Sequence, residues 1–187
     1  METCTVFPGT RTYRDVKRLY LSAFPPEERR PLSSLWLLSV IRPKVSLLAY
    51  REGKTLCGFT LTVSSEKYLY ISFIAVNPSL RGEGHGSQIL AQLRQAHPDQ
   101  ALLVEVEAPD ESADNYSQRV KRIAFYRRNG FYDLDRTITG RGVTYQLLST
   151  DTTFDREAYR RIFDQLSFGL RARLKKLRQK LLPGQTP

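Results

Sequence analysis

A glycine-rich segment lies near the middle of the chain, between an apolar stretch and an amphipathic one. It reads RGEGHG over residues 81–86, soon after the apolar run YLYISFIAV at 68–76 and just before apolar residues at helical spacing in 84–97. The first run favours a strand and the second a helix. Glycines at a helix start let a ligand approach the backbone, whose unpaired amides attract an anion. The segment therefore predicts a phosphate-binding loop between a strand and a helix.

Two common phosphate-binding patterns do not fit this loop. A Walker A loop needs a lysine before its serine or threonine, and the residue before Ser87 is Gly86. The dinucleotide fingerprint GxGxxG fails as well, because Ile89 stands where the last glycine is required after Gly84 and Gly86. The remaining pattern is RxxGxG over 81–86.

The surrounding sequence predicts an α/β fold with a mixed, mainly antiparallel sheet flanked by helices. Two helices open the chain, the first with a capping box at Thr12 and Asp15 and the second with Pro31 in its first turn. The charged loop FPPEERRP separates them. Short β-rich runs and helical repeats then follow one another. The expected strands are a short run from Cys4, then 45–50, 55–63, 68–76, 101–108 and 143–149, with helices over 84–97 and 115–128.

Length and composition indicate a single domain with an appendage. The 187 residues, 41% hydrophobic and 26% charged, are enough for one sizeable core. We expect a domain over 1–150 and a basic amphipathic helical extension over 151–187. No apolar run approaches the ~18 residues of a membrane span, and the first residues lack the pattern of a secretory signal. These features, with only two cysteines, predict a cytoplasmic protein.

The extension carries most of the excess positive charge. Residues 155–187 hold nine Lys and Arg against three acids, within a net charge of +10 for the chain. Its leucines recur mostly three or four apart, which predicts an amphipathic helix over about 155–182. We expect this helix to dock onto the domain or onto a second subunit, forming a homodimer. Contact of RARLKKLRQK, at 171–180, with nucleic acid or an anionic membrane is the alternative.

Beyond the loop, a second motif adds to the pattern. FYRRNGF at 125–131 ends a predicted helix, and the strand VEVE at 104–107 lies between the two motifs. With RxxGxG, these segments resemble the GNAT acyltransferase superfamily and its FYxxxGF motif, in detail over 68–131 and generally over 1–150. The resemblance implies an N-acetyltransferase that moves acetyl from acetyl-CoA to a primary amine by direct attack.

The resemblance also implies roles for individual residues. Tyr126 is expected to protonate the departing thiolate, with its hydroxyl accessible at the edge of the helix's apolar stripe. Glu105 is expected to accept the proton of the incoming amine, with Glu107 as the second candidate. An alkyl amine is almost fully protonated at neutral pH, so a base is needed. The expected coenzyme-binding residues are Ile74, Ala75 and Val76 for the pantetheine arm and Arg81, Gly82, Glu83, Gly84, His85, Gly86 and Ser87 for the pyrophosphate.

The acceptor side is less well defined by sequence. Glu27, Glu28 and Arg29, in the loop between the first two helices, are candidate acceptor contacts. The loop after the fifth strand is longer than in the family pattern, with Arg119 in the usual asparagine position and Asn115 as a possible replacement. No metal is expected, because neither histidine has a second ligand nearby in sequence. The alternative function is a non-catalytic CoA-fold module that binds nucleic acid or membrane through its basic tail.

Overall fold

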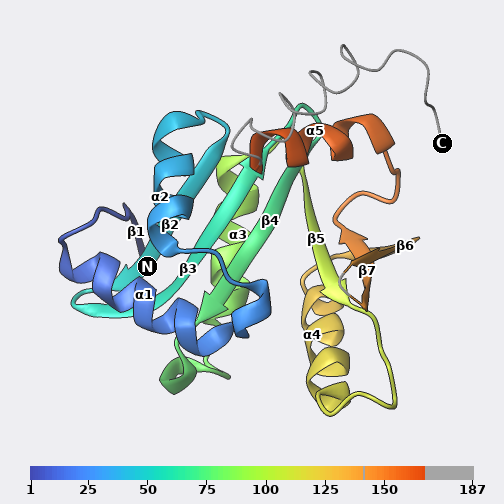
Figure 1. Ribbon diagram of the computed structural model, residues 1–187, viewed down its shortest axis with the longest axis horizontal. Coiled ribbons are helices and arrows are strands. Elements are labelled where there is room, and N and C mark those ends of the chain that lie inside the picture. The colour runs from blue at the N-terminus through green and yellow to red at the C-terminus, as the bar shows by residue number, and fades with distance from the viewer. Residues whose placement is uncertain (141, 167–187) are drawn as a thin grey trace, which may run out of the picture.

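The computed structural model describes residues 1–140 and 142–166, except for the side chain of Glu27. In these residues, seven strands form one sheet in the order β1-β2-β3-β4-β5-β7-β6 (Figure 1). Neighbouring strands are antiparallel except β4 and β5, which are parallel. The predicted α/β fold with a mixed, mainly antiparallel sheet is confirmed. The strands are β1 Glu2–Thr5, β2 Val45–Glu52, β3 Thr55–Ser64, β4 Tyr68–Val76, β5 Ala101–Glu107, β6 Tyr132–Gly140 and β7 Val143–Ser149.

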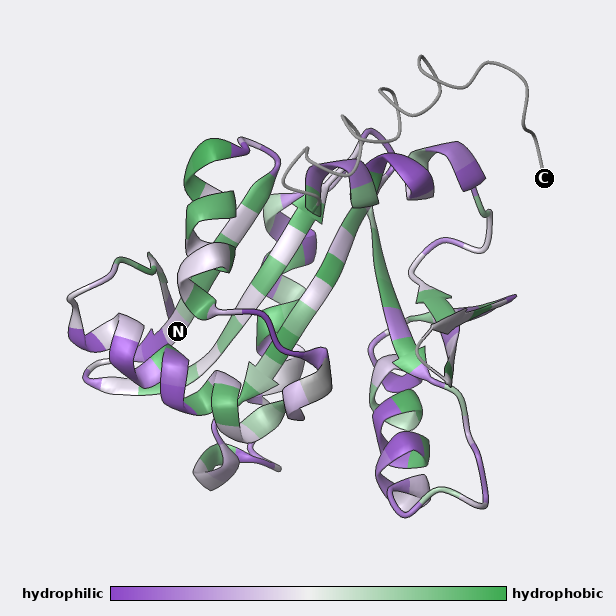
Figure 2. Cartoon of the chain, viewed as in Figure 1, coloured by the Kyte–Doolittle hydropathy of each residue, from purple (hydrophilic) through white to green (hydrophobic). Residues whose placement is uncertain are grey.

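Helices cover both faces of the sheet. On one face α1, α2 and α5 share a core with β2, β3 and β4, and on the other α3 and α4 pack against β4, β5 and β7. Apolar residues accordingly concentrate on the central strands and on α2, whereas much of α1 and α5 is hydrophilic (Figure 2). The helices are α1 Arg11–Ala23, α2 Leu32–Ile41, α3 His85–Ala96, α4 Tyr116–Arg128 and α5 Arg156–Leu166, with short 3₁₀ helices η1 Pro26–Glu28 and η2 Pro78–Leu80.

A bulge in β4 and a short β4–β5 pairing open the sheet at its centre. Leu61 pairs with Phe73 while the next residue of β3 pairs with Ile71, so Ser72 is an extra residue that bends β4. The parallel pairing joins Tyr68–Tyr70 to the first three residues of β5 and stops there. Beyond that point the two strands diverge (Figure 1). The end of β4 therefore has no strand partner on the β5 side among the described residues.

The first part of the C-terminal extension packs onto the sheet. Ala158 and Ile162 of α5 are buried in the same core as α1 and α2. The Tyr68 hydroxyl donates to the carbonyl of Thr153 at 3.0 Å and accepts from the amide of Asp155 at 2.8 Å. The basic part of the predicted helix, from residue 167 onward, lies outside the described residues. None of the described helices is both long and apolar enough to cross a bilayer.

Two local details differ from the sequence prediction. The N-cap of α1 is Thr10, not Thr12, because the Thr10 side chain accepts a hydrogen bond from the amide of Tyr13 at 3.1 Å. The strand β6 was not predicted. It lies at the edge of the sheet with most of its side chains exposed, so it lacks an apolar alternation.

Candidate active site

The glycine-rich loop connects the open end of β4 to α3. Gly82 and Gly84 have φ of +88° and +84°, a left-handed conformation that favours glycine. Gly84 is the N-cap of α3, no side chain caps this helix start, and the first turn holds no acid. The first amides of α3 therefore keep their donors and the positive end of the helix dipole for an anion.

The three glycines of the loop have different physical roles. A Cβ on Gly82 or Gly84 would meet nothing within 4 Å, so both backbones face open space. A Cβ on Gly86 would lie 3.1 Å from the Phe125 ring, so this glycine lets α3 and α4 pack closely. His85 points inward with 7% of its surface exposed. The other predicted loop residues, Arg81, Glu83 and Ser87, are exposed.

The predicted pantetheine-binding residues lie on the end of β4, where the strand pairs with β3 but has no strand partner on the β5 side among the described residues. Ala75 is buried, whereas Ile74 and Val76 are half-buried and pack with the α3–α4 core. The amide of Asn77, directly after the strand, donates to the carbonyl of Cys57 at 2.8 Å. This bond fixes the point where the strand passes into the loop.

Tyr126 comes from α4 on the same face as α3. Its side chain is 3% exposed, and its ring centroid lies 5.2 Å from that of Phe125 and 5.1 Å from that of Phe131. The accessible position expected from the helical stripe is thus a buried one, because Phe131 folds back over the ring. Burial raises the pKa of Tyr126 to about 12, so the hydroxyl keeps its proton at neutral pH.

Glu105 lies on the opposite face of β5, under α5. The Tyr159 hydroxyl of α5 donates to Glu105 Oε1 at 2.6 Å. Burial raises the pKa of Glu105, and the hydroxyls of Tyr159 and Tyr70 oppose that rise. Burial and then the carboxylate of Glu105 hold the pKa of Tyr70 well above its usual range, with smaller contributions from Tyr159 and Tyr126. Tyr70 on β4 is therefore a hydrogen-bond partner of Glu105.

The carboxylate of Glu107 forms ion pairs with two arginine side chains. Its carboxylate lies 3.0 Å from Arg119 Nη2 and 3.2 Å from Arg122 Nη1, and the Asn115 side chain donates to it at 3.3 Å. Arg119 also donates to Asn115 at 2.7 Å and to the carbonyl of Ala108 at 3.1 Å. Asn115 and Arg119 together thus anchor the long loop to the end of β5.

The predicted acceptor residues lie near β7. Burial and then the carboxylates of Glu28, Glu107 and Glu105 raise the pKa of Tyr145, and the guanidinium of Arg119 opposes the rise. The Nε atom of Arg29 is buried without a hydrogen-bond partner. The side chain of Glu27 lies outside the described residues.

Sequence reasoning did not identify Tyr70, Tyr145 or Tyr159 as part of this site. Tyr145 pairs with Glu107 across β5 and β7. Tyr70 and Tyr159 converge on Glu105 from β4 and α5. The sequence pattern around these tyrosines predicts the strand or helix in which each one lies. It does not predict that they meet, because that depends on the strand order of the sheet and on how α5 packs against it.

Comparison with known proteins gives one family. The family model described as an acetyltransferase (GNAT) domain matches residues 43–133. No curated protein sequence is similar enough to the chain to count as a match.

Solved structures share the fold. A protein assigned to the GNAT acetyltransferase family, from Bacteroides thetaiotaomicron, is similar over 99% of this chain and 100% of its own, with a TM-score of 0.68 and 21% identity. An aminoglycoside 6'-N-acetyltransferase complexed with coenzyme A aligns over 83% and 99%, with a TM-score of 0.59 and 14% identity. A GNAT acetyltransferase from Elizabethkingia anophelis with acetyl-CoA bound aligns over 80% and 97%, with a TM-score of 0.54 and 15% identity. Residues 43–133 thus match the GNAT acetyltransferase domain, and the chain shares its fold with solved GNAT acetyltransferases.

Proposed function

We propose that this protein is an N-acetyltransferase that transfers the acetyl group of acetyl-CoA directly to a primary amine. The observation that carries this proposal is the open end of β4, which leads into an uncapped helix start at Gly84. The alternative, a non-catalytic binding module acting through the basic tail, rests on residues outside those that the structure describes.

The coenzyme is expected to bind along this open end. Amides of the segment 81–87 would hold the diphosphate, which the left-handed Gly82 and Gly84 and the absence of acid in the first turn favour. The backbone of residues 74–76 would hold the pantetheine arm. Acetyl-CoA supplies the thioester carbonyl that the amine attacks. Two structural neighbours, described as bound to coenzyme A or acetyl-CoA, support this choice of cosubstrate.

Glu105 is proposed as the base that accepts the proton of the incoming ammonium group. Burial raises its pKa, which makes its carboxylate a stronger base than an exposed glutamate. Activity should therefore rise with pH as Glu105 loses its proton. Glu107 fits this role less well, because Arg119 and Arg122 already pair with its carboxylate.

Tyr126 is proposed as the acid that protonates the departing thiolate. A hydroxyl whose pKa is raised to about 12 retains its proton over the whole neutral range. Backbone amides near the end of β4 would stabilise the negative charge on the carbonyl oxygen during attack. Direct attack needs no nucleophilic side chain of the enzyme.

The acceptor is proposed to be an amine that carries positive charge. The carboxylates of Glu28 and Glu105, which both raise the pKa of Tyr145, support a cation on this side of the site, whereas the carboxylate of Glu107 is paired with Arg119 and Arg122. Glu28 and Arg29 remain proposed contacts for the acceptor. A homodimer and a cytoplasmic location also remain predictions from sequence.

A screen of diverse primary amines with acetyl-CoA, detected by thiol release, tests the proposal. Glu105→Gln is expected to reduce turnover at least about 100-fold, the usual contribution of a general base. Glu111→Gln, in an exposed loop, is the matched control and should behave as wild type. Failure of every amine to release thiol from folded protein, or full turnover by Glu105→Gln, would contradict the assignment.

A further inference from the structure

Three side chains of metal-ligating type meet where the β2–β3 hairpin lies against the start of α3. Glu52 ends β2, Cys57 lies early in β3, and His85 is the first residue of α3. One carboxylate oxygen, the sulfur and one ring nitrogen all lie within 4.8 Å of one another. Because His85 is far from the hairpin in the sequence, residue spacing alone does not reveal this cluster.

The polar atoms of the cluster have few hydrogen-bond partners within the protein. His85 Nδ1 is buried and has no hydrogen-bond partner, and Nε2 lies 3.6 Å from Glu52 Oε2, beyond good hydrogen-bond distance. Cys57 is fully buried, and its sulfur makes a long contact of 4.0 Å with the carbonyl of Thr55. Buried polar atoms normally have partners, so this convergence calls for an additional group.

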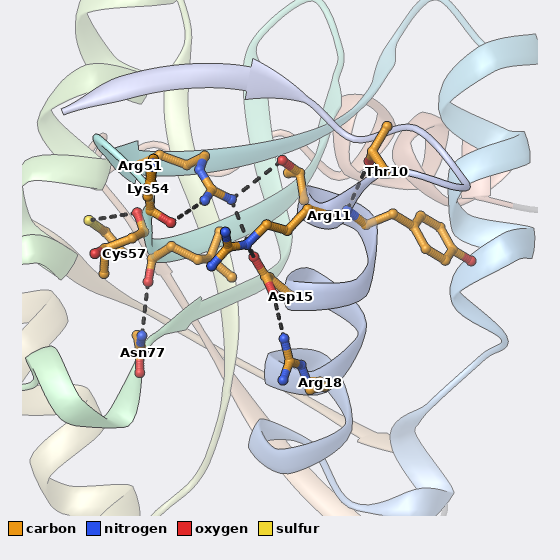
Figure 3. A network of polar contacts seen from close by, with 12 residues as sticks. Thr10, Arg11, Asp15, Arg18, Arg51, Lys54, Cys57 and Asn77 are labelled. Atoms are coloured by element: carbon orange, nitrogen blue, oxygen red, sulfur yellow. Dashed lines mark hydrogen bonds and ion pairs between the residues drawn. The ribbon is translucent and has the colours of Figure 1, made fainter.

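The backbone around the cluster is fixed by other contacts. The Arg51 side chain, next to Glu52, donates to Asp15 at 3.5 Å and to the carbonyl of Lys54 (Figure 3). On the opposite side, the Asn77 side chain donates to the carbonyl of Leu56 at 2.9 Å. The hairpin is thus held against α1 and against the end of β4, which keeps the three ligand-type residues together.

We propose that Glu52, Cys57 and His85 bind a zinc-type divalent cation, with the fourth position left to water. Sulfur, imidazole and carboxylate are the ligands that zinc takes in proteins, and three of them plus water make a common site. Magnesium and calcium prefer sites built wholly of oxygen ligands, so the buried sulfur disfavours them.

The carboxylate of Glu83 lies on the other side of the same imidazole ring. Its Oε2 lies 3.9 Å from His85 Nδ1, while Nε2 faces Glu52. Ligating histidines commonly present their other ring nitrogen to a carboxylate, which orients the ring. The two atoms are too far apart for a hydrogen bond here, and Glu83 is the proposed orienting carboxylate of the occupied site.

A reactive thiol is the competing role for Cys57, and its surroundings oppose it. The Cys57 side chain is fully buried, whereas nucleophilic or redox-active cysteines are partly exposed to solvent. The argument for this cation site does not rest on the acetyl-transfer chemistry, but His85 belongs to the segment 81–87 that is proposed to hold the diphosphate. A cation there would tie the hairpin to the segment 83–85 of the glycine-rich loop.

Cobalt titration of the reduced, chelator-treated full chain tests the proposal. We expect one Co²⁺ per chain, with a thiolate-to-cobalt absorption band in the near ultraviolet that Zn²⁺ abolishes. Cys57→Ser should lose this band while Cys4→Ser, which removes the other cysteine, retains it. Absence of the band in the wild type, or its persistence in Cys57→Ser, overturns the site.

Two further variants separate ligation from general loss of fold. Glu52→Gln changes an exposed side chain and should weaken Co²⁺ binding at least 10-fold. Glu83→Gln should weaken it about 10- to 100-fold, the usual effect of removing an orienting carboxylate. Thermal melting of each metal-free variant checks folding. Wild-type Co²⁺ affinity in a folded Glu52→Gln variant contradicts the proposal.

Discussion

Removing the Tyr159 hydroxyl should shift the pH dependence of acetyl transfer to higher pH. This hydroxyl donates to Glu105 Oε1 at 2.6 Å and stabilises the charged carboxylate. Burial already raises the pKa of Glu105, and the Tyr159 bond opposes that rise. In Tyr159→Phe the pKa of Glu105 therefore rises further, so the base becomes active only at higher pH.

The size of the effect follows from the strength of this bond. A hydrogen bond to a charged group contributes about 1.5 to 3 kcal/mol, which corresponds to roughly 10- to 150-fold. The neighbouring Tyr70 hydroxyl remains, and Glu105 is only half-buried, so the lower end is expected. Below the pKa of Glu105, kcat/KM should fall roughly 10-fold, and it should equal the wild-type value on the alkaline plateau.

The assay is the pH profile of thiol release with an amine found in the screen. Phe at position 159 keeps the ring contacts to Phe154 and Phe163, whose centroids lie 5.7 Å and 5.0 Å from that of Tyr159. Tyr132→Phe, an exposed tyrosine on β6, is the control. An NMR titration of the ¹³C-labelled Glu105 carboxyl measures its pKa directly and needs no acceptor amine. Superimposable profiles, or an equal loss at every pH, would refute the reasoning.

Three other changes test separate parts of the site. Gly84→Ala places a side chain at φ +84°, which should lower the free energy of unfolding by about 1–2 kcal/mol and weaken coenzyme A binding. The control is Gly9→Ala, at φ +83° outside the loop, which should lose similar stability but bind coenzyme A as wild type does in calorimetry. Tyr126→Phe should lower kcat about 100-fold with unchanged coenzyme affinity, and equal turnover would remove its role as acid. Deletion of residues 168–187 should leave coenzyme affinity and kcat unchanged, and a fall in either would place the tail in the site.

The fold was predictable where the apolar periodicity is strong. The three strands of the meander and the helix after the glycine-rich loop have clear patterns and appear in the structure. β6 was missed because YDLDRTITG is mostly exposed and polar, as suits an edge strand. The start of α1 was misplaced because residues around Thr10 are polar, so periodicity does not fix the first turn.

The candidate site was predictable only where it is local in sequence. The loop over 81–86 is one continuous segment, so spacing alone indicates an anion site. The contact between Glu105 and Tyr159 spans 54 residues and depends on how α5 docks. The meeting of Glu52, Cys57 and His85 likewise depends on the hairpin lying against α3. Such convergence needs the three-dimensional structure.

Calorimetric titration with coenzyme A and with pantetheine, which lacks the diphosphate, tests the central claim most directly. If amides of the segment 81–87 hold the diphosphate, coenzyme A should bind and pantetheine should bind far more weakly. No binding of coenzyme A at millimolar concentration, or equal affinity for the two compounds, would contradict the account.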